Sequence, residues 1–277
     1  MLKPLLKYEF RYYRKIMTIA LLVMAVSVLL IRLGSEAFYW MPETAETFEE
    51  SLMVIASVPL LLLSEILRYA VIFTLALPLL LCAVRFYRNL TQDPGYLSFT
   101  LPVKPSQHVF CKTFVPLVWT LILAVVRILT GTLVSLIVDG DLTDITGEVL
   151  TLSSILKGEG VWLEAWIVLL VVFAFLCLVN TIVMINFSIS LGQLFRKHKL
   201  IGSILSYLGL STAFGIFMGS LSIFSISLID FEATLAGEML NTYMVSMLSN
   251  LSFLTSLICI LMYWGCCYIM TKKLNLE

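Results

Sequence analysis

The chain has 277 residues, of which 60% are hydrophobic and 13% are charged, and its mean hydropathy is +0.99. Soluble domains are nearer half apolar and a quarter charged, so this composition exceeds what a soluble core buries and indicates an integral membrane protein. Lys and Arg total 18, as do Asp and Glu. The resulting zero net charge excludes a polybasic nucleic-acid-binding protein.

Apolar runs long enough to cross a bilayer recur six times along the chain. The hydrocarbon core is roughly 30 Å thick, and a helix needs about 20 mostly apolar residues to cross it. The runs that meet this length are 16–33, 66–84, 113–138, 162–191, 200–225 and 251–270. We therefore predict an all-α polytopic membrane protein with six transmembrane helices in a single transmembrane domain, 1–277.

The segment before the first span, residues 1–15, is amphipathic. On a helical wheel its basic residues fall within one third of the circle and its apolar residues lie opposite. The basic residues are Lys3, Lys7, Arg11, Arg14 and Lys15. This pattern predicts an interfacial helix whose basic face meets lipid phosphates or a cytoplasmic partner.

Glu9 breaks the pattern of this helix because it projects from the apolar face. A carboxylate in that place either pairs with a cation, for which Arg85 and Arg88 are the candidates, or reaches water at the helix edge. Both interpretations stay open at the level of sequence.

A shorter apolar stretch, 51–64, precedes the second span and is interrupted by Pro59. It is too short to cross a bilayer with its own flanks, so we expect a helix that lies on or dips into the outer surface, the alternative being a seventh span. Glu65 and Arg68 follow it, one helical turn apart. We expect them to form a local ion pair near the headgroups.

The charges divide between two sets of loops. Fourteen basic residues and three acidic ones fall in the N-terminal segment, the 85–112 loop, the 192–199 loop and the C-terminal segment. Fourteen acidic residues fall in the intervening loops and their flanks. The positive-inside rule therefore predicts that both termini lie in the cytoplasm, and an even number of spans agrees with this.

The 85–112 loop carries a distinctive local pattern. Asp93 followed by Pro94 is typical of a helix start, and Pro102 ends the segment, so a short helix near 95–100 is expected. Its apolar side chains on the cytoplasmic side are Tyr96, Leu97, Phe99 and Leu101. They need either a protein partner or the bilayer surface to cover them.

Few polar residues interrupt the predicted spans. Arg127 lies 15 residues after Lys112 and 12 before Asp139, which places it near mid-membrane on the predicted span. Inserting an Arg at that depth costs at least ~2.5–3.5 kcal/mol, so we expect it to face a partner, a cavity or a subunit interface. Asn180 and Asn186 are expected to hydrogen-bond between helices or simply to pack.

Small residues form a row on the fifth span, at Ser211, Gly215 and Gly219. Such a row lets helix backbones approach closely, either at a dimer seam or within one subunit.

The motifs of common enzymes and metal sites are missing. The chain contains no G-x-x-x-x-G-K-[ST] nucleotide-binding loop and no H-E-x-x-H zinc motif, and its two histidines, His108 and His198, both fall on the predicted cytoplasmic side. All six cysteines fall in spans or on that side, so no disulfide is expected. We therefore expect no catalytic site, metal or cofactor on this chain.

Several segments together resemble a known family. They are KYEF at 7–10, RFYRNL at 85–90, GYLSFTLP at 95–102, GQLFRKHKLIGSIL at 192–205 and KKLNLE at 272–277. With these segments the chain resembles the permease subunits of ABC-2-type exporters, particularly the single-domain bacterial ones.

The resemblance implies a set of roles and partners. The loop after the second span would be a coupling helix, with Asp93, Gly95, Tyr96, Leu97, Phe99 and Leu101, that docks into a groove of a separate cytoplasmic ATPase. The N-terminal helix, with Glu9, Arg11 and Arg14, would lie beside it on the inner leaflet. ATP and Mg would bind to the ATPase, and a second permease copy or homologue would complete the exporter in the bacterial plasma membrane.

The resemblance implies efflux of a peptide, a drug or a lipid-like molecule and does not identify which. Two other functions remain open from the sequence. One is a stand-alone secondary transporter or channel, and the other is a membrane scaffold without transport.

Overall fold

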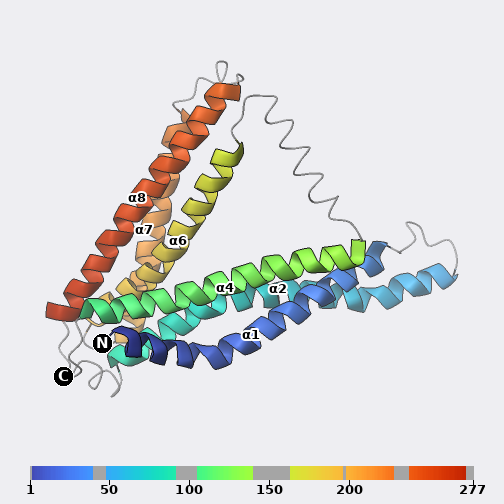
Figure 1. Ribbon diagram of the computed structural model, residues 1–277, viewed down its shortest axis with the longest axis horizontal. Helices are drawn as coiled ribbons and strands as arrows, with labels where there is room; N and C mark the ends of the chain where they lie inside the picture. The colour runs from blue at the N-terminus through green and yellow to red at the C-terminus, as the bar shows by residue number, and fades with distance from the viewer. Residues whose placement is uncertain are drawn as a thin grey trace. The chain divides into compact units, whose positions relative to one another are not determined.

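A computed structural model describes residues 2–39, 48–91, 105–139, 163–195, 198–227 and 237–272. Six helices account for nearly all of them (Figure 1): α1 (Leu2–Tyr39), α2 (Phe48–Thr91), α4 (Pro105–Asp139), α6 (Leu163–Gly192), α7 (Lys199–Ser227) and α8 (Gly237–Lys272). Each contains a stretch long and apolar enough to cross a membrane. The predicted all-α fold with six membrane-crossing helices is therefore confirmed.

All the helices except α6 extend beyond the apolar runs that predicted them. The membrane-crossing stretches are Lys3–Ile31, Leu62–Leu90, Ser106–Leu133, Ala165–Gly192, Lys199–Phe224 and Tyr243–Lys272. In particular, α2 runs to Thr91 and α4 begins at Pro105, so both helices enter the predicted 85–112 loop. Only 92–104 of that loop lies outside the described residues.

The amphipathic N-terminal segment and the first span form one continuous helix, α1, which bends along its length (Figure 1). All five basic residues of the segment are exposed, as the helical wheel predicts for a solvated or headgroup-facing surface. On the other side, Tyr13, Met17, Ala20 and Met24 recur at intervals of three and four residues and are buried. This spacing is that of one helix face packed against its neighbours.

The stretch 51–64 is neither a separate surface helix nor a separate span. It forms part of α2, a helix of 44 residues with Pro59 and Pro78 in its interior. At 1.5 Å per residue such a helix is roughly 66 Å long, more than the bilayer thickness. The expectation of an independent helix was wrong because a proline weakens a helix locally without having to end it.

The contacts divide the chain into two compact units. The first comprises Met1–Leu6, Cys82–Leu117 and Ile145–Glu277, and the second comprises Lys7–Leu81 and Val118–Asp144. The helices α2 and α4 each contribute one end to the first unit. Within that unit α6 packs along both α7 and α8 (Figure 1).

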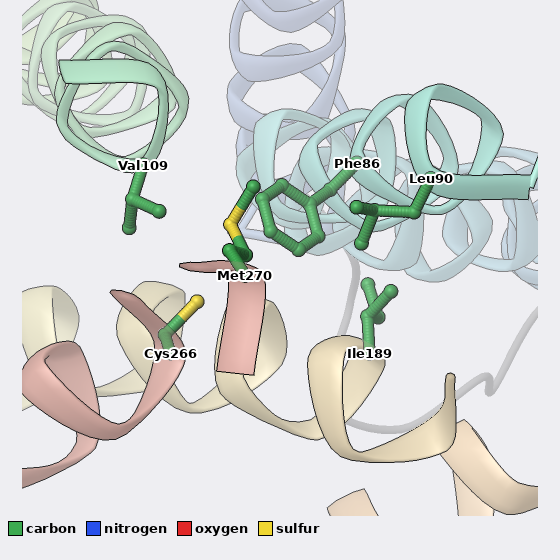
Figure 2. Close-up of a cluster of buried hydrophobic side chains, with 6 residues drawn as sticks. All are labelled: Phe86, Leu90, Val109, Ile189, Cys266 and Met270. Carbon is green, nitrogen blue, oxygen red and sulfur yellow. The ribbon is translucent and has the colours of Figure 1, made fainter. Parts of the chain in front are cut away.

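The core of the first unit lies where the ends of four helices meet. Figure 2 shows Phe86 and Leu90 from α2, Val109 from α4, Ile189 from α6, and Cys266 and Met270 from α8 pointing toward one another. All six side chains are buried. The two helix ends that flank 92–104 are therefore packed against α6 and α8.

A tight turn joins α6 to α7, and glycines make it possible. A Cβ built on Gly192 would collide with the Ser203 side chain and lie 2.6 Å from the Ser203 backbone nitrogen. Likewise, a Cβ on Gly202 would lie 2.5 Å from the Phe195 ring. At Gly192 a side chain is excluded because the backbone of Ser203 approaches closely, whereas at Gly202 the nearest atoms belong to the Phe195 ring.

The predicted row of small residues on α7 has no such neighbour. A Cβ built on Gly215 or Gly219 meets no atom within 4 Å. Within the described part of this chain, the row is therefore not used for close helix packing.

Candidate functional site

Beside the hydrophobic core, polar side chains that are buried or, at Asn89, half-buried connect the same four helices. We call this set the polar network, and its members are Cys82 and Asn89 on α2, Lys112 and Thr113 on α4, Asn186 and Ser190 on α6, and Cys266 on α8. All lie within the first compact unit. Polar side chains at such a place are expected to hydrogen-bond across helices, because the apolar surroundings provide no water.

Asn186 lies at the centre of the polar network and is fully buried, with 0% exposure. Its Nδ2 donates to Thr113 Oγ1 at 3.2 Å. The Thr113 hydroxyl in turn donates to the Val109 carbonyl at 2.9 Å, which leaves its lone pair for the amide. Asn186 thus joins α6 to α4.

Cys82 extends the polar network to α2. Its thiol lies 3.5 Å from Asn186 Oδ1 and 3.4 Å from the Lys112 carbonyl oxygen. The single S–H serves one of these acceptors at a time, and each places α2 beside a neighbouring helix.

Ser190 connects the polar network to α8. Its hydroxyl lies 2.9 Å from the Asn186 carbonyl, to which it donates, and 3.2 Å from Cys266 Sγ. A further hydrogen bond joins α8 to α4, because the Tyr263 hydroxyl donates to the Ser106 carbonyl at 2.9 Å. Hydrogen bonds therefore fasten all four helix ends to one another.

Lys112 is the charged member of the polar network and is only 7% exposed. With the Asn89 amide oriented so that its oxygen faces the ammonium, Lys112 Nζ donates to that oxygen at 2.6 Å. The ammonium also lies 5.9 Å from the centroid of the Phe86 ring. Both contacts replace part of the hydration that an ammonium loses on burial.

The sequence-predicted coupling residues cannot be compared with this geometry. Asp93, Gly95, Tyr96, Leu97, Phe99 and Leu101 all lie outside the described residues. The structure describes the two helix ends that lead into and out of them, and both ends belong to the polar network.

Glu9, Arg11 and Arg14 lie on α1. The structure buries Glu9, at 5% exposure, and it does not leave this carboxylate without a partner. The alternative in which Glu9 reaches water at the helix edge therefore does not describe this conformation. Arg11 and Arg14 are exposed.

Glu65 and Arg68 form the predicted ion pair on α2, with 3.3 Å between Glu65 Oε1 and Arg68 Nη1. Both side chains are more than half exposed, so the pair contributes little to stability.

Arg127 is exposed on α4, and no described acidic side chain forms an ion pair with it. It lies among exposed apolar neighbours, including Val125, Ile128 and Leu129. α4 continues past Arg127 to Asp139. The position of Arg127 near mid-membrane stays a prediction.

The two asparagines of α6 differ in their hydrogen bonds. Asn186 makes the predicted interhelical bond, whereas the Asn180 oxygen is buried without a hydrogen-bond partner among the described residues. Asn180 is thus a packed polar residue with an unsatisfied acceptor.

Sequence reasoning missed the burial of Lys112 and His108, which it assigned to a cytoplasmic loop. The structure places both on α4, and His108 is 6% exposed. One signal was available, because 108, 112 and 115 share a helix face and extend the periodicity of the third span towards Pro105.

Within the described ranges, no three His, Cys, Asp or Glu side chains are grouped so as to hold a metal ion.

Comparison with known proteins gives no relative. No protein-family model, curated protein or solved structure has a significant match to this chain. The function therefore has to be argued from the sequence motifs and the geometry described above.

Proposed function

We propose that this chain is the membrane subunit of an ATP-binding-cassette exporter. It pairs with a second copy or a related permease and with separate cytoplasmic ATPase chains that bind ATP and Mg. Both termini lie in the cytoplasm, the complex resides in the bacterial plasma membrane, and the cargo is a peptide, a drug or a lipid-like molecule. The basis is the family resemblance of the motifs quoted above.

One structural observation supports the proposal most directly. The proposed coupling segment is connected on one side to α2, which ends at Thr91, and on the other to α4, which begins at Pro105. Both helix ends are fastened to α6 and α8 by the core around Phe86 and by the polar network. A force applied to the segment would therefore reach four helices at once.

This connection suggests a mechanism in which ATP binding closes the ATPase pair. Residues 93–102, together with the N-terminal helix, then carry that closure to the spans, and the pathway switches from inward to outward access. The chain itself contributes no chemistry to ATP hydrolysis.

A stand-alone secondary transporter or channel fits less well. Such transporters bind their substrate at broken helices in corresponding places of two halves. The six described helices are each continuous, including α2 and α4 with their interior prolines. A scaffold without transport offers no reason for apolar side chains on a short cytoplasmic segment.

The proposal is tested by two substitutions in the coupling segment, Leu97→Asp and Phe99→Asp. A charge in an apolar docking surface costs binding energy, so each should reduce by tenfold or more the ATPase stimulation that the reconstituted wild-type complex shows. Thr271→Asp is the matched control, because it adds the same charge at the exposed end of α8, and it should leave stimulation unchanged. Full stimulation with both coupling variants would overturn the docking role.

A further inference from the structure

Lys112 forms a bridge from α4 to one turn of α2, residues 85–89. Its ammonium donates to the side-chain oxygen of Asn89, and the same amide's nitrogen donates to the Arg85 carbonyl at 3.3 Å. An ammonium has donors only, so the amide oxygen must be the atom that faces it. The amide is thereby held at both ends, by its own helix and by α4.

The aromatic ring of Phe86 strengthens this bridge. Phe86 lies one turn before Asn89 on the same face of α2 and is 1% exposed. Its ring is 5.9 Å from Lys112 Nζ. A cation above a desolvated ring is attracted more strongly than one above an exposed ring, because water does not screen the interaction.

The bridge lies between the two described helix ends that flank residues 92–104. Asn89 is two residues before the end of α2 at Thr91, and Lys112 is seven residues after the start of α4 at Pro105. Between these two ends lie the proposed coupling residues. The bridge adds to the apolar packing around Phe86 and to the contact of the Cys82 thiol with the Lys112 carbonyl oxygen.

We propose that Lys112 is a positioning residue. Together with Asn89 and Phe86 it forms a clamp that makes the adjoining ends of α2 and α4 one rigid body. The role of the clamp in coupling rests on the proposed function. When the coupling segment moves, the clamp makes α2 and α4 move together, and α6 and α8 move with them. Without the clamp, the ATPase would still dock. Its closure would then separate the ends of α2 and α4 from each other and would not move α6 and α8.

The rigidity of the clamp is measured independently of any ATPase. Spin-labelled amino acids are incorporated at Val84 and Phe110, two exposed positions on α2 and α4, and their distance distribution is recorded in lipid nanodiscs. We expect a narrow distribution in the unsubstituted chain and at least a twofold broadening with Lys112→Met or Asn89→Leu. Asn89→Asp, which keeps an acceptor and adds an opposite charge, should keep it narrow.

The matched control is Lys272→Met on α8. Lys272 also lies above an aromatic ring, 5.5 Å from the centroid of Tyr268, but it is exposed. This variant should leave the distribution narrow. Equal widths for the unsubstituted chain, Lys112→Met and Asn89→Leu would overturn the clamp.

The coupling role is measured in the complex with the ATPase. Lys112→Met should retain the ATPase on purification and lose tenfold or more of its stimulation, whereas Leu97→Asp should lose the ATPase itself. Equal stimulation by Lys112→Met and wild type would overturn the coupling role while leaving the proposed function intact. Absence of any ATPase from the wild-type chain would overturn the proposed function, and the spin-label distances would still decide whether the clamp exists.

Discussion

The two buried asparagines of α6 differ in their hydrogen bonds, so they allow the contribution of one hydrogen bond to stability to be measured. Asn186 is fully buried and bonded to Thr113, whereas Asn180, at 2% exposure, has an oxygen that no described residue hydrogen-bonds. A buried bonded amide stabilises the fold, and a buried unbonded acceptor destabilises it. The pair offers an internal comparison at matched burial.

We expect Asn186→Leu to lower the free energy of unfolding by about 0.6 to 1.7 kcal/mol, from the average to the maximum measured for interhelical hydrogen bonds in a membrane protein. Asn180→Leu should be neutral or stabilising because it removes an unsatisfied oxygen. Thermal unfolding of the two purified variants in the same detergent checks this difference. The account of the polar network fails if Asn180→Leu proves the more destabilising of the two.

At the level of residues, the sequence predicted some partners and missed others for a physical reason. The pair of Glu65 and Arg68 was predictable because both residues lie on one helix, one turn apart. The burial of Lys112 was not, because its amide and aromatic partners are on α2, more than 20 residues away along the chain. The sequence analysis placed Lys112 in the 85–112 loop on the cytoplasmic side, where it would contact water.

Among the elements, the connection between α6 and α7 depends on glycine at one position. Gly192 ends α6 where the backbone of Ser203 passes, and Leu194 N and Phe195 N donate to the carbonyls of Leu191 and Gly192 at 3.0 and 3.2 Å. The turn is therefore fixed by hydrogen bonds and leaves no space for a side chain.

Gly192→Ala should cost about 1–3 kcal/mol of stability, because its Cβ would collide with Ser203 and force the two backbones apart. Gly219→Ala on α7 is the matched control and should be neutral or up to about 1 kcal/mol stabilising, because alanine is the better helix former and the position is open. Unfolding midpoints measure both. A tolerated Gly192→Ala would contradict the close approach of the helices.

The elements themselves were largely predictable because a run of apolar residues is a local property of the chain. The ends of the helices were less predictable, since α2 and α4 continue as helices through polar residues such as Arg85, Asn89 and Lys112. Hydropathy alone predicts a loop at these residues. Their helical state is stabilised by packing against α6 and α8, which hydropathy does not report.

For the whole molecule, composition indicated the membrane, and the placement of charge predicted the topology. The division into two compact units was not predictable, because it depends on contacts between segments far apart in the chain, such as Cys82–Leu117 with the helices after Ile145. The same holds for the polar network. No local sequence pattern marks its members, because they come together only where the four helices pack against one another.

The central claim is that this chain works with a separate ATPase. The most direct test is to purify the chain and determine which other chains copurify with it. The full chain is tagged, extracted in mild detergent from the membranes of the cells that make it, and assayed for bound chains and for vanadate-sensitive ATP hydrolysis. We predict a complex in which a chain with a G-x-x-x-x-G-K-[ST] loop is present in an equal number of copies and hydrolyses ATP. A stable, folded chain that carries no such ATPase and no ATP hydrolysis would contradict the account.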